Sequence, residues 1–218
     1  MVNHEPRRGA DVPPPPRPVA PTVWSLPEGT QLFTVHPLEV DSVPVVPGSF
    51  PPGRAQRASR FAPLGSGVGV LYAATSALGV LTETVLHDLA ENGLLVPEQY
   101  ERFAVSSGQT TRSLRLAALH GGWLTEIGLQ PEWLTHTDAR HDAATVEWAD
   151  AVHSDTDVAG LMWNSRRDPS AQTVALFADR AEGALRVEGN TAALGSPGGF
   201  EWLAGLCQGI GVRALPAV

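Results

Sequence analysis

The sequence predicts one domain of the α+β class, and three observations lead to this prediction. Short apolar and β-branched runs of strand length recur along the chain, whereas few segments show helical spacing. Strand and helix signals do not alternate regularly, as a doubly wound α/β sheet would require. A length of 218 residues, 43% of them hydrophobic, is sufficient for one domain with a core. No internal repeat is visible.

The first 22 residues predict a disordered arm outside the folded domain. They include Pro13 to Pro16, Pro18 and Pro21, and consecutive prolines lack amide donors and favour polyproline II. We expect the folded domain to occupy residues 23–194. Residues 195–218 are rich in glycine, and we expect them to form a C-terminal segment that can pack on this domain.

The remaining pattern predicts strands, helices and one long loop. Ser76 offers an N-cap to a helix whose apolar residues extend to Leu89, and Gly93 provides a stop. Residues 37–53 contain five prolines and two glycines and predict an irregular loop. Strands are expected at 31–35, 68–74, 114–119, 158–163, 173–177 and 185–187, and helical segments at 123–134, 142–153 and 200–206.

Composition limits the classes of function. The formal net charge of −8 argues against a general nucleic-acid binder, but the local cluster Arg54, Arg57 and Arg60 leaves room for a nucleotide. No apolar run reaches the roughly 20 residues of a membrane helix, and the charged start leads into proline, unlike a signal peptide. The single cysteine, Cys207, fits a reducing cytoplasm. No histidine pair has zinc spacing, so we expect no metal.

Four polar residues could carry chemistry, and each also has an ordinary structural explanation. Arg60, beside Phe61, presents a fork that matches phosphate or carboxylate, or it is a solvated surface arginine. Tyr72 is either a core tyrosine or a site residue. Helical periodicity places Glu83 away from the apolar face, which favours a solvated glutamate. Ser165 follows a strand and could cap backbone groups; it lacks the surroundings of an esterase nucleophile.

The order of these fragments resembles the RES family, bacterial proteins known for toxins that destroy NAD. The resemblance rests on Ser59-Arg60-Phe61, on Leu71-Tyr72, on Leu81-Thr82-Glu83-Thr84 and on Trp163-Asn164-Ser165-Arg166-Arg167, and it covers roughly residues 28 to 188. It implies a compact domain related to ADP-ribosyltransferase toxins, with small mixed sheets around a cleft and surrounding helices. The family's arginine–aromatic pair, here Arg60 and Phe61, is thought to hold the dinucleotide.

The resemblance implies cleavage of the nicotinamide–ribose bond of NAD by phosphate or water, without a cofactor. Arg60 would hold diphosphate or ribose, Tyr72 would orient the nicotinamide side, Glu83 would support the oxocarbenium ion, and Ser165 would complete the substrate contacts. Such proteins are commonly paired with a helix-turn-helix (Xre-type) antitoxin, and a homodimer is left open. Two alternatives remain: ADP-ribose transfer to a macromolecule, or a degenerate protein that binds a nucleotide or partner without catalysis.

One departure from the family pattern bears on catalysis. The family has a further arginine in its first strand, and Thr34, in the run Leu32-Phe33-Thr34-Val35-His36, occupies that position. A threonine contributes a hydrogen bond but no charge, so one phosphate contact is expected to be lost. A charge-assisted contact contributes about 1.5–3 kcal/mol. Thr34 is therefore the main support for the degenerate alternative.

Overall fold

The fold is described by a computed structural model that covers residues 12–40, 43–46, 59–62, 64–87, 89, 93–135, 141–165, 168, 170–188 and 191–217. Within this part, strands and helices are mixed along the chain, and the predicted α+β class is confirmed. No helix among these residues is both long and apolar enough to span a bilayer.

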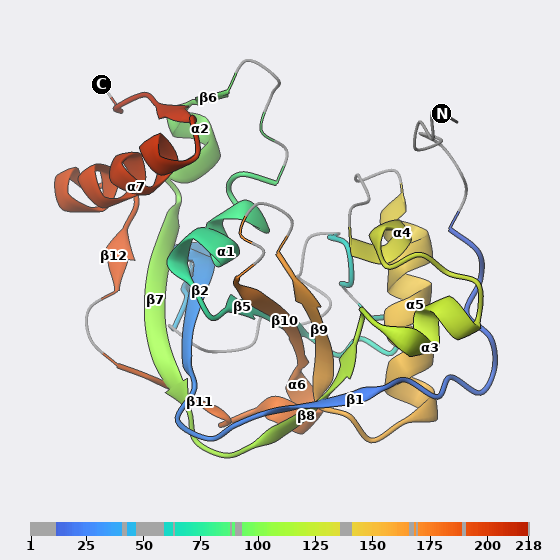
Figure 1. Ribbon diagram of the computed structural model, residues 1–218. Coiled ribbons are helices and arrows are strands. Elements are labelled where there is room, and N and C mark those ends of the chain that lie inside the picture. The colour runs from blue at the N-terminus through green and yellow to red at the C-terminus, as the bar shows by residue number, and fades with distance from the viewer. Residues whose placement is uncertain are drawn as a thin grey trace, which may run out of the picture.

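A single curled sheet organises the molecule (Figure 1). Nine described strands belong to it, and every neighbouring pair is antiparallel except the parallel pair β8–β9. In spatial order they are β1 (Val23–Leu26), β8 (Leu114–Ala118), β9 (Gly160–Asn164), β10 (Gln172–Phe177), β5 (Val70–Ala74), β2 (Gln31–Pro37), β7 (Phe103–Thr110) and β11 (Leu185–Val187), with β12 (Ala192–Ala193) also on β7.

The mixed sheet that the resemblance implies takes the form of one continuous curled sheet of nine described strands. Its two halves meet where β2 pairs with β5 at one position, Phe33 opposite Ala74. Two separate two-stranded sheets complete the described strands: β3 (Glu39–Val40) with β4 (Val43–Pro44), and β6 (Leu94–Leu95) with β13 (Arg213–Ala214). The β3–β4 pair falls in the predicted loop 37–53, of which residues 41–42 and 47–53 lie outside the description.

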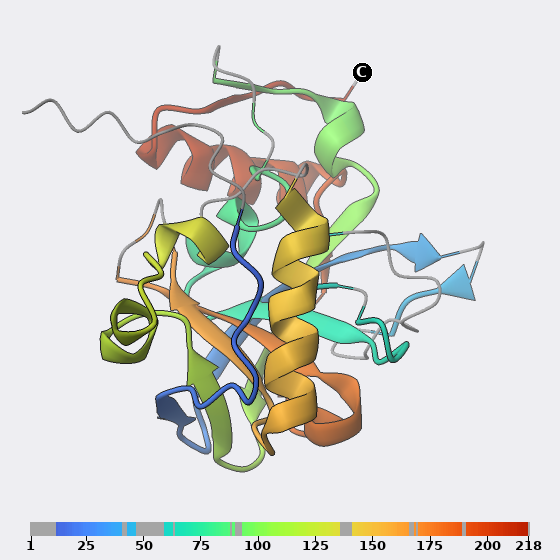
Figure 2. The ribbon, with the colours of Figure 1, turned by 90° about the vertical axis from the view of Figure 1, so that its right-hand side faces the viewer.

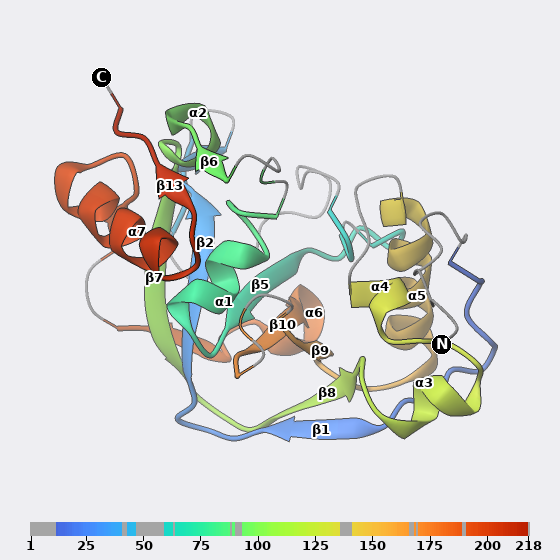
Figure 3. The ribbon, with the colours of Figure 1, turned by 45° about the horizontal axis from the view of Figure 1, so that its top comes forward.

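The larger helices pack against one face of the sheet, because α5 contacts the cluster that contains Val70 and Tyr72 of β5 and α7 contacts the cluster that contains Ala74 of the same strand. Figure 3 shows α7 and the β6–β13 pair on one side of α1, with α5 on the other side. Buried aromatic residues, including Phe61, Trp148 and Trp163, form a core cluster beneath α5. The helices are α1 (Ala77–Thr82), α2 (Pro97–Tyr100), α3 (Gly122–Glu126), α4 (Glu132–Thr135), α5 (Asp142–Asp155), α6 (Ala178–Ala181) and α7 (Pro197–Gly209).

Several elements differ from the sequence prediction, α1 and β7 among them. Ser76 caps α1 as expected, accepting a hydrogen bond from the Gly79 amide at 2.9 Å, but the helix ends at Thr82 and continues as a turn. β-Branched and hydroxyl residues follow, and the Thr84 hydroxyl donates to the Val80 carbonyl at 2.7 Å, which competes with regular helix. Strand β7 was not predicted, because its Ser107 and Gly108 have weak strand propensity.

The N-terminal arm also differs from its expectation, because residues 12–22 pack against the fold (Figure 2). Val19 is buried and its amide donates to Asp155 at 2.8 Å. The Trp148 indole donates to the Pro13 carbonyl at 2.7 Å. A proline-rich strand without internal hydrogen bonds can dock where a helix supplies the partners, and α5 supplies both here. Residues 1–11 lie outside the description.

Candidate functional site

The loop that carries Arg60 is fixed from three sides. Its ends, Ser59 and Ala62, form a reciprocal pair of backbone hydrogen bonds at 2.8 and 3.1 Å. The Thr145 hydroxyl of α5 donates to the Arg60 carbonyl. The Phe61 amide donates to the Tyr72 hydroxyl of β5 at 2.9 Å. The backbone of Arg60 is therefore held in place by the sheet and by α5.

Arg60 and Glu83 form a buried ion pair. Nη1 of Arg60 lies 2.7 Å from Oε2 of Glu83, and the two side chains are 8% and 5% exposed. Glu83 is the C-cap residue that follows α1, and its carboxylate accepts a hydrogen bond from Arg60. Nη2 of Arg60 lies 2.8 Å from Nε2 of His87. In such a poorly solvated place each charge requires its partner, because an unpaired buried ion is strongly destabilising.

Aromatic rings lie beside the ion pair. Phe61 packs on Trp163 of β9 with ring centroids 5.2 Å apart, and Tyr72 meets the same indole edge-on at 6.3 Å. Burial raises the pKa of Tyr72 to about 12, despite opposing hydrogen bonds from Ser59 and Phe61. Tyr72 is therefore a neutral phenol at physiological pH. Nε1 of Trp163 is buried and has no hydrogen-bond partner within the described residues.

Ser165 is joined to the same region through Thr82. The Thr82 hydroxyl donates to the Gly79 carbonyl at 2.8 Å and lies 3.0 Å from Oγ of Ser165. Because a hydroxyl has one proton, Ser165 donates in the second contact. Thr82 immediately precedes Glu83, so this bond ties the end of β9 to the turn that carries the glutamate. Ser165 is 2% exposed.

Close packing of α1 against the segment between β9 and β10 supports the contact between Thr82 and Ser165. A β-carbon added at Gly79 would lie 2.8 Å from the β-carbon of Ala171, so α1 sits against the β9–β10 connection at a distance that only glycine permits. The Ser76 hydroxyl donates to Asp168 in that connection at 2.6 Å. Hydrogen bonds from Ser170 and Ser76 lower the pKa of Asp168.

Thr34 is not brought together with the other predicted site residues. Phe33 and Ala74 are cross-strand partners and share a face of the sheet. By alternation Tyr72 lies on that face, whereas Thr34 lies on the opposite one. Thr34 is 1% exposed, and its hydroxyl has no hydrogen-bond partner in the described part of the chain.

Three contacts of the site were not anticipated from sequence. Thr145 holds the Arg60 backbone, Thr82 holds Ser165, and His87 contacts the Arg60 guanidinium. The spacing of four between Glu83 and His87 was an available signal, since residues four apart meet on a helical turn. The two threonine contacts join segments that are far apart in sequence, so no local sequence pattern predicts them.

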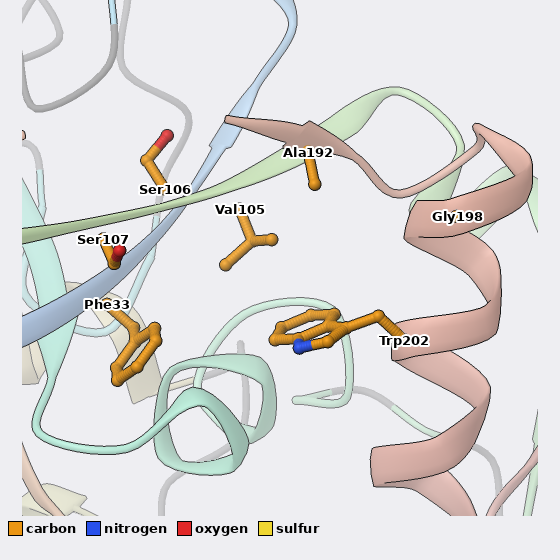
Figure 4. Close-up of a pocket in the computed structure, with 7 residues that line it drawn as sticks. All are labelled: Phe33, Val105, Ser106, Ser107, Ala192, Gly198 and Trp202. Atoms are coloured by element: carbon orange, nitrogen blue, oxygen red, sulfur yellow. The ribbon is translucent and has the colours of Figure 1, made fainter. Parts of the chain in front are cut away.

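A separate pocket of about 330 Å³ lies between β7, β12 and α7. Figure 4 shows Phe33, Val105 and Trp202 around it, while the Ser106 side chain points away. Ser107, Ala192 and Gly198 complete its lining, so none of Arg60, Tyr72, Glu83 and Ser165 borders it.

The single cysteine, Cys207, is buried. Burial raises the pKa of Cys207 to about 11, which makes this thiol a poor nucleophile. Across the described ranges, no group of three or more His, Cys, Asp or Glu residues is arranged to hold a metal ion.

Comparisons with known proteins agree with this architecture. A family model described as the RES domain matches residues 36–195. Among solved structures, the chain is similar to one in "Crystal structure of the M.tuberculosis MbcT-MbcA toxin-antitoxin complex". The TM-score is 0.55 at 15% identity, covering 85% of this chain and 91% of that chain, a likeness of fold. The predicted RES-type fold is thus confirmed. Comparison with curated proteins gives no match.

Proposed function

The chain belongs to the RES domain family, and from this premise we propose that it cleaves the nicotinamide–ribose bond of NAD. The observation that carries the proposal is the buried Arg60–Glu83 pair, held beside Tyr72 and Phe61 by two elements of the fold. A carboxylate kept out of bulk water suits a reaction that develops positive charge on a sugar.

In this mechanism the bond between ribose C1 and the nicotinamide nitrogen breaks, and its electron pair leaves with neutral nicotinamide. Glu83 stabilises the oxocarbenium ion, which a phosphate oxygen or water then attacks at C1. If water attacks, it loses one proton to solvent or to a nearby base. The products are nicotinamide with ADP-ribose 1″-phosphate or ADP-ribose. Tyr72 stays protonated and can donate to the substrate, because its pKa is about 12.

Arg60 has two roles in this proposal. Without substrate its guanidinium balances the Glu83 carboxylate at 2.7 Å. With NAD bound, the diphosphate or ribose offers Arg60 a further acceptor, and a planar fork can serve two acceptors at once. The proposed role of Ser165 is to complete the substrate contacts, and its contact with Thr82, the residue before Glu83, supports this role. Phosphate is the proposed co-substrate, and no cofactor enters the scheme.

We also propose that the chain is the toxin of a two-protein system. Support comes from its family and from the likeness in fold to a chain of a toxin–antitoxin complex. The proposed partner is a helix-turn-helix antitoxin that covers the site, and the proposed compartment is the bacterial cytoplasm, where NAD is present.

A non-catalytic binding protein is the second candidate, and Thr34 favours it. Its buried hydroxyl has no partner in the described part of the chain and supplies no positive charge where the family pattern has arginine. A protein that lost a phosphate contact could retain nucleotide or partner binding without turnover. ADP-ribose transfer to a macromolecule is distinguished by the same experiment.

The test is an incubation of purified protein with NAD, with and without phosphate, followed by chromatography. Release of nicotinamide with ADP-ribose 1″-phosphate or ADP-ribose supports the proposal and identifies the acceptor. Labelled protein or nucleic acid indicates transfer, and unchanged NAD supports the non-catalytic candidate. Glu83→Gln is the matched control, because the amide oxygen can still accept from Arg60 while the negative charge is removed.

A further inference from the structure

Residues 12–22 of the N-terminal arm lie along one side of α5 (Figure 2). The Pro13 carbonyl accepts a hydrogen bond from the Trp148 indole at 2.7 Å, and the Val19 amide donates to Asp155 at 2.8 Å. Trp148 and Asp155 are seven residues apart, or about two helical turns, so they lie on the same side of the helix. The arm therefore contacts α5 at two points along its length.

The C-terminal end of α5, where Asp155 lies, has an anchor besides the arm. The Arg180 guanidinium of α6 donates to the carbonyls of His153, Thr156 and Val158 at 2.6, 2.8 and 2.9 Å. These three carbonyls stand where the helix leaves its last backbone acceptors without partners in the helix. This end of α5 is therefore held by Arg180 as well as by the arm.

The N-terminal half of α5 holds the loop that carries Arg60. The Thr145 hydroxyl is fully buried and donates to the Arg60 carbonyl. Thr145 and Trp148 are three residues apart, so they are neighbours on the helix surface. Val12 of the arm and Phe61 of the loop belong to the same buried cluster as Trp148. The contact between the arm and Trp148 thus lies one helical turn from the residue that holds the loop.

We propose that the N-terminal arm is a positioning element of the site, which acts on the Arg60 loop through α5. The helix rests on the aromatic cluster, and apolar packing has no preferred direction. Directional hydrogen bonds therefore fix the rotation of α5 on this cluster, and the bond from Trp148 to the Pro13 carbonyl is the one beside Thr145. A small rotation of this half of the helix would carry Thr145 away from the Arg60 carbonyl. The effect on turnover rests on the proposed NAD reaction, but the effect on the loop does not.

The first measurement is hydrogen–deuterium exchange of the full chain, read by NMR at the Ser59, Phe61 and Ala62 amides. Each of these amides donates to an oxygen within the loop or to the Tyr72 hydroxyl. In Val12→Asp, which places a charge at a buried contact of the arm, we expect them to exchange about tenfold faster, roughly the loss of one hydrogen bond. The amides of β5 should exchange as in the parent. If Val12→Asp does not fold, Val12→Ser is the milder replacement.

Two control variants separate positioning of the loop from a general loss of stability. Arg17→Ala removes the ion pair with Asp155 at 2.9 Å, at the end of α5 that Arg180 also holds, and should leave the loop amides unchanged. Leu114→Ala opens a cavity in the separate buried cluster on the other face of the sheet. It should lower the melting temperature without a selective increase in loop exchange. A loop that exchanges as fast in either control as in Val12→Asp would contradict the proposal.

A double-variant cycle tests the route through Trp148. Trp148→Phe keeps an aromatic ring but lacks the N–H that donates to the Pro13 carbonyl, so it should also speed exchange of the loop amides. Because Val12→Asp and Trp148→Phe disrupt the same contact, the double variant should exchange no faster than the faster single variant. Additive effects would show that the arm does not act through Trp148. Exchange of the loop at the parent's rate in a folded Val12→Asp protein would overturn the inference.

The second measurement is the steady-state kinetics of NAD consumption by variants that are folded at the assay temperature. In Val12→Asp and Trp148→Phe we expect KM for NAD to rise about fivefold or more with kcat within about threefold, because Arg60 is the proposed substrate contact. Arg17→Ala should keep the parent's KM. Faster loop exchange without a change in KM would contradict a role of the arm in the site. If the parent itself leaves NAD unchanged, the proposed reaction fails, and the exchange rates still decide whether the arm positions the loop.

Discussion

Replacing Glu83 by alanine should destabilise the protein as well as inactivate it. The substitution removes the carboxylate at 2.7 Å from an Arg60 side chain that is only 8% exposed. Removing one partner of a buried pair typically costs about 3–5 kcal/mol, because the remaining charge stays buried without compensation. His87 accepts one hydrogen bond from Arg60 but offers no negative charge, so it cannot replace the carboxylate.

This magnitude corresponds to a large shift in melting temperature. For chains of 150–250 residues, 1 kcal/mol shifts the midpoint by about 2–4 °C, so Glu83→Ala should melt about 6–20 °C below the parent. Because total stability is typically about 5–15 kcal/mol, the variant should remain folded only at moderate temperature. Glu83→Gln keeps an acceptor for Arg60 and should lose about 1–2 kcal/mol.

The assay is thermal and urea unfolding followed by circular dichroism, with two comparisons. Asp157→Ala removes a partner from the exposed Arg115–Asp157 pair, at 2.6 Å, and should change stability by less than about 1 kcal/mol. The double variant Arg60→Met/Glu83→Met removes both charges and should recover part of the single-variant loss. If Glu83→Ala melts within about 2 °C of the parent, the description of a buried, mutually dependent pair is wrong.

Four further outcomes are expected. A chain that begins at Val23 should melt about 5–10 °C below the full chain, because it lacks the segment docked on α5; equal melting curves would show that this docking adds no stability. Gly79→Ala should cost about 1–3 kcal/mol in urea unfolding through its 2.8 Å clash, whereas Gly205→Ala, which meets nothing within 4 Å, should be neutral or stabilising. Thr34→Val should be neutral or stabilising, because the hydroxyl that it removes has no hydrogen-bond partner among the described residues. Thr34→Arg should unfold at lower urea concentration, because it buries a charge. A stable Thr34→Arg protein with higher affinity for NAD would contradict the placement of Thr34 away from the site. Since the pKa of Tyr72 is raised from 10 to about 12, its contribution should be fully present below pH 10 and be lost as pH rises toward 12, and Tyr72→Phe should remove that part of the alkaline loss in a pH series of urea unfolding curves.

The fold was predictable where one local pattern governs one element. Short, largely continuous apolar runs indicated β5, β9 and β10, and a Ser76 cap indicated the start of α1, as the structure has them. The strand β7 escaped prediction because its place in the sheet compensates for weak strand formers. The docking of residues 12–22 was not predicted, because a proline-rich composition does not reveal that a distant tryptophan indole, Trp148, donates a hydrogen bond to the Pro13 carbonyl.

For the candidate site, too, the sequence predicted the residue types but not their contacts. Sequence order and residue type singled out Arg60, Tyr72, Glu83 and Ser165. The fold joins Arg60 to Glu83 directly, Tyr72 to this pair through the Phe61 amide, and Ser165 through Thr82. Helical periodicity alone favoured a solvated Glu83. That inference assumed a helix continuing to residue 89, and it fails because α1 ends before the glutamate.

The sequence by itself determined the strands with continuous apolar runs, the start of α1 and which polar residues are available for chemistry, because capping and side-chain patterns act over a few neighbouring residues. Only the tertiary structure decided which of those polar residues are buried and what they contact. Arg60 meets a carboxylate 23 positions away and a threonine hydroxyl 85 positions away, while Thr34 lies on the opposite face of the sheet from Tyr72. Burial and charge pairing depend on elements that meet only after the chain has folded, and these set the Tyr72 pKa, the Arg60–Glu83 pair and the place of His87.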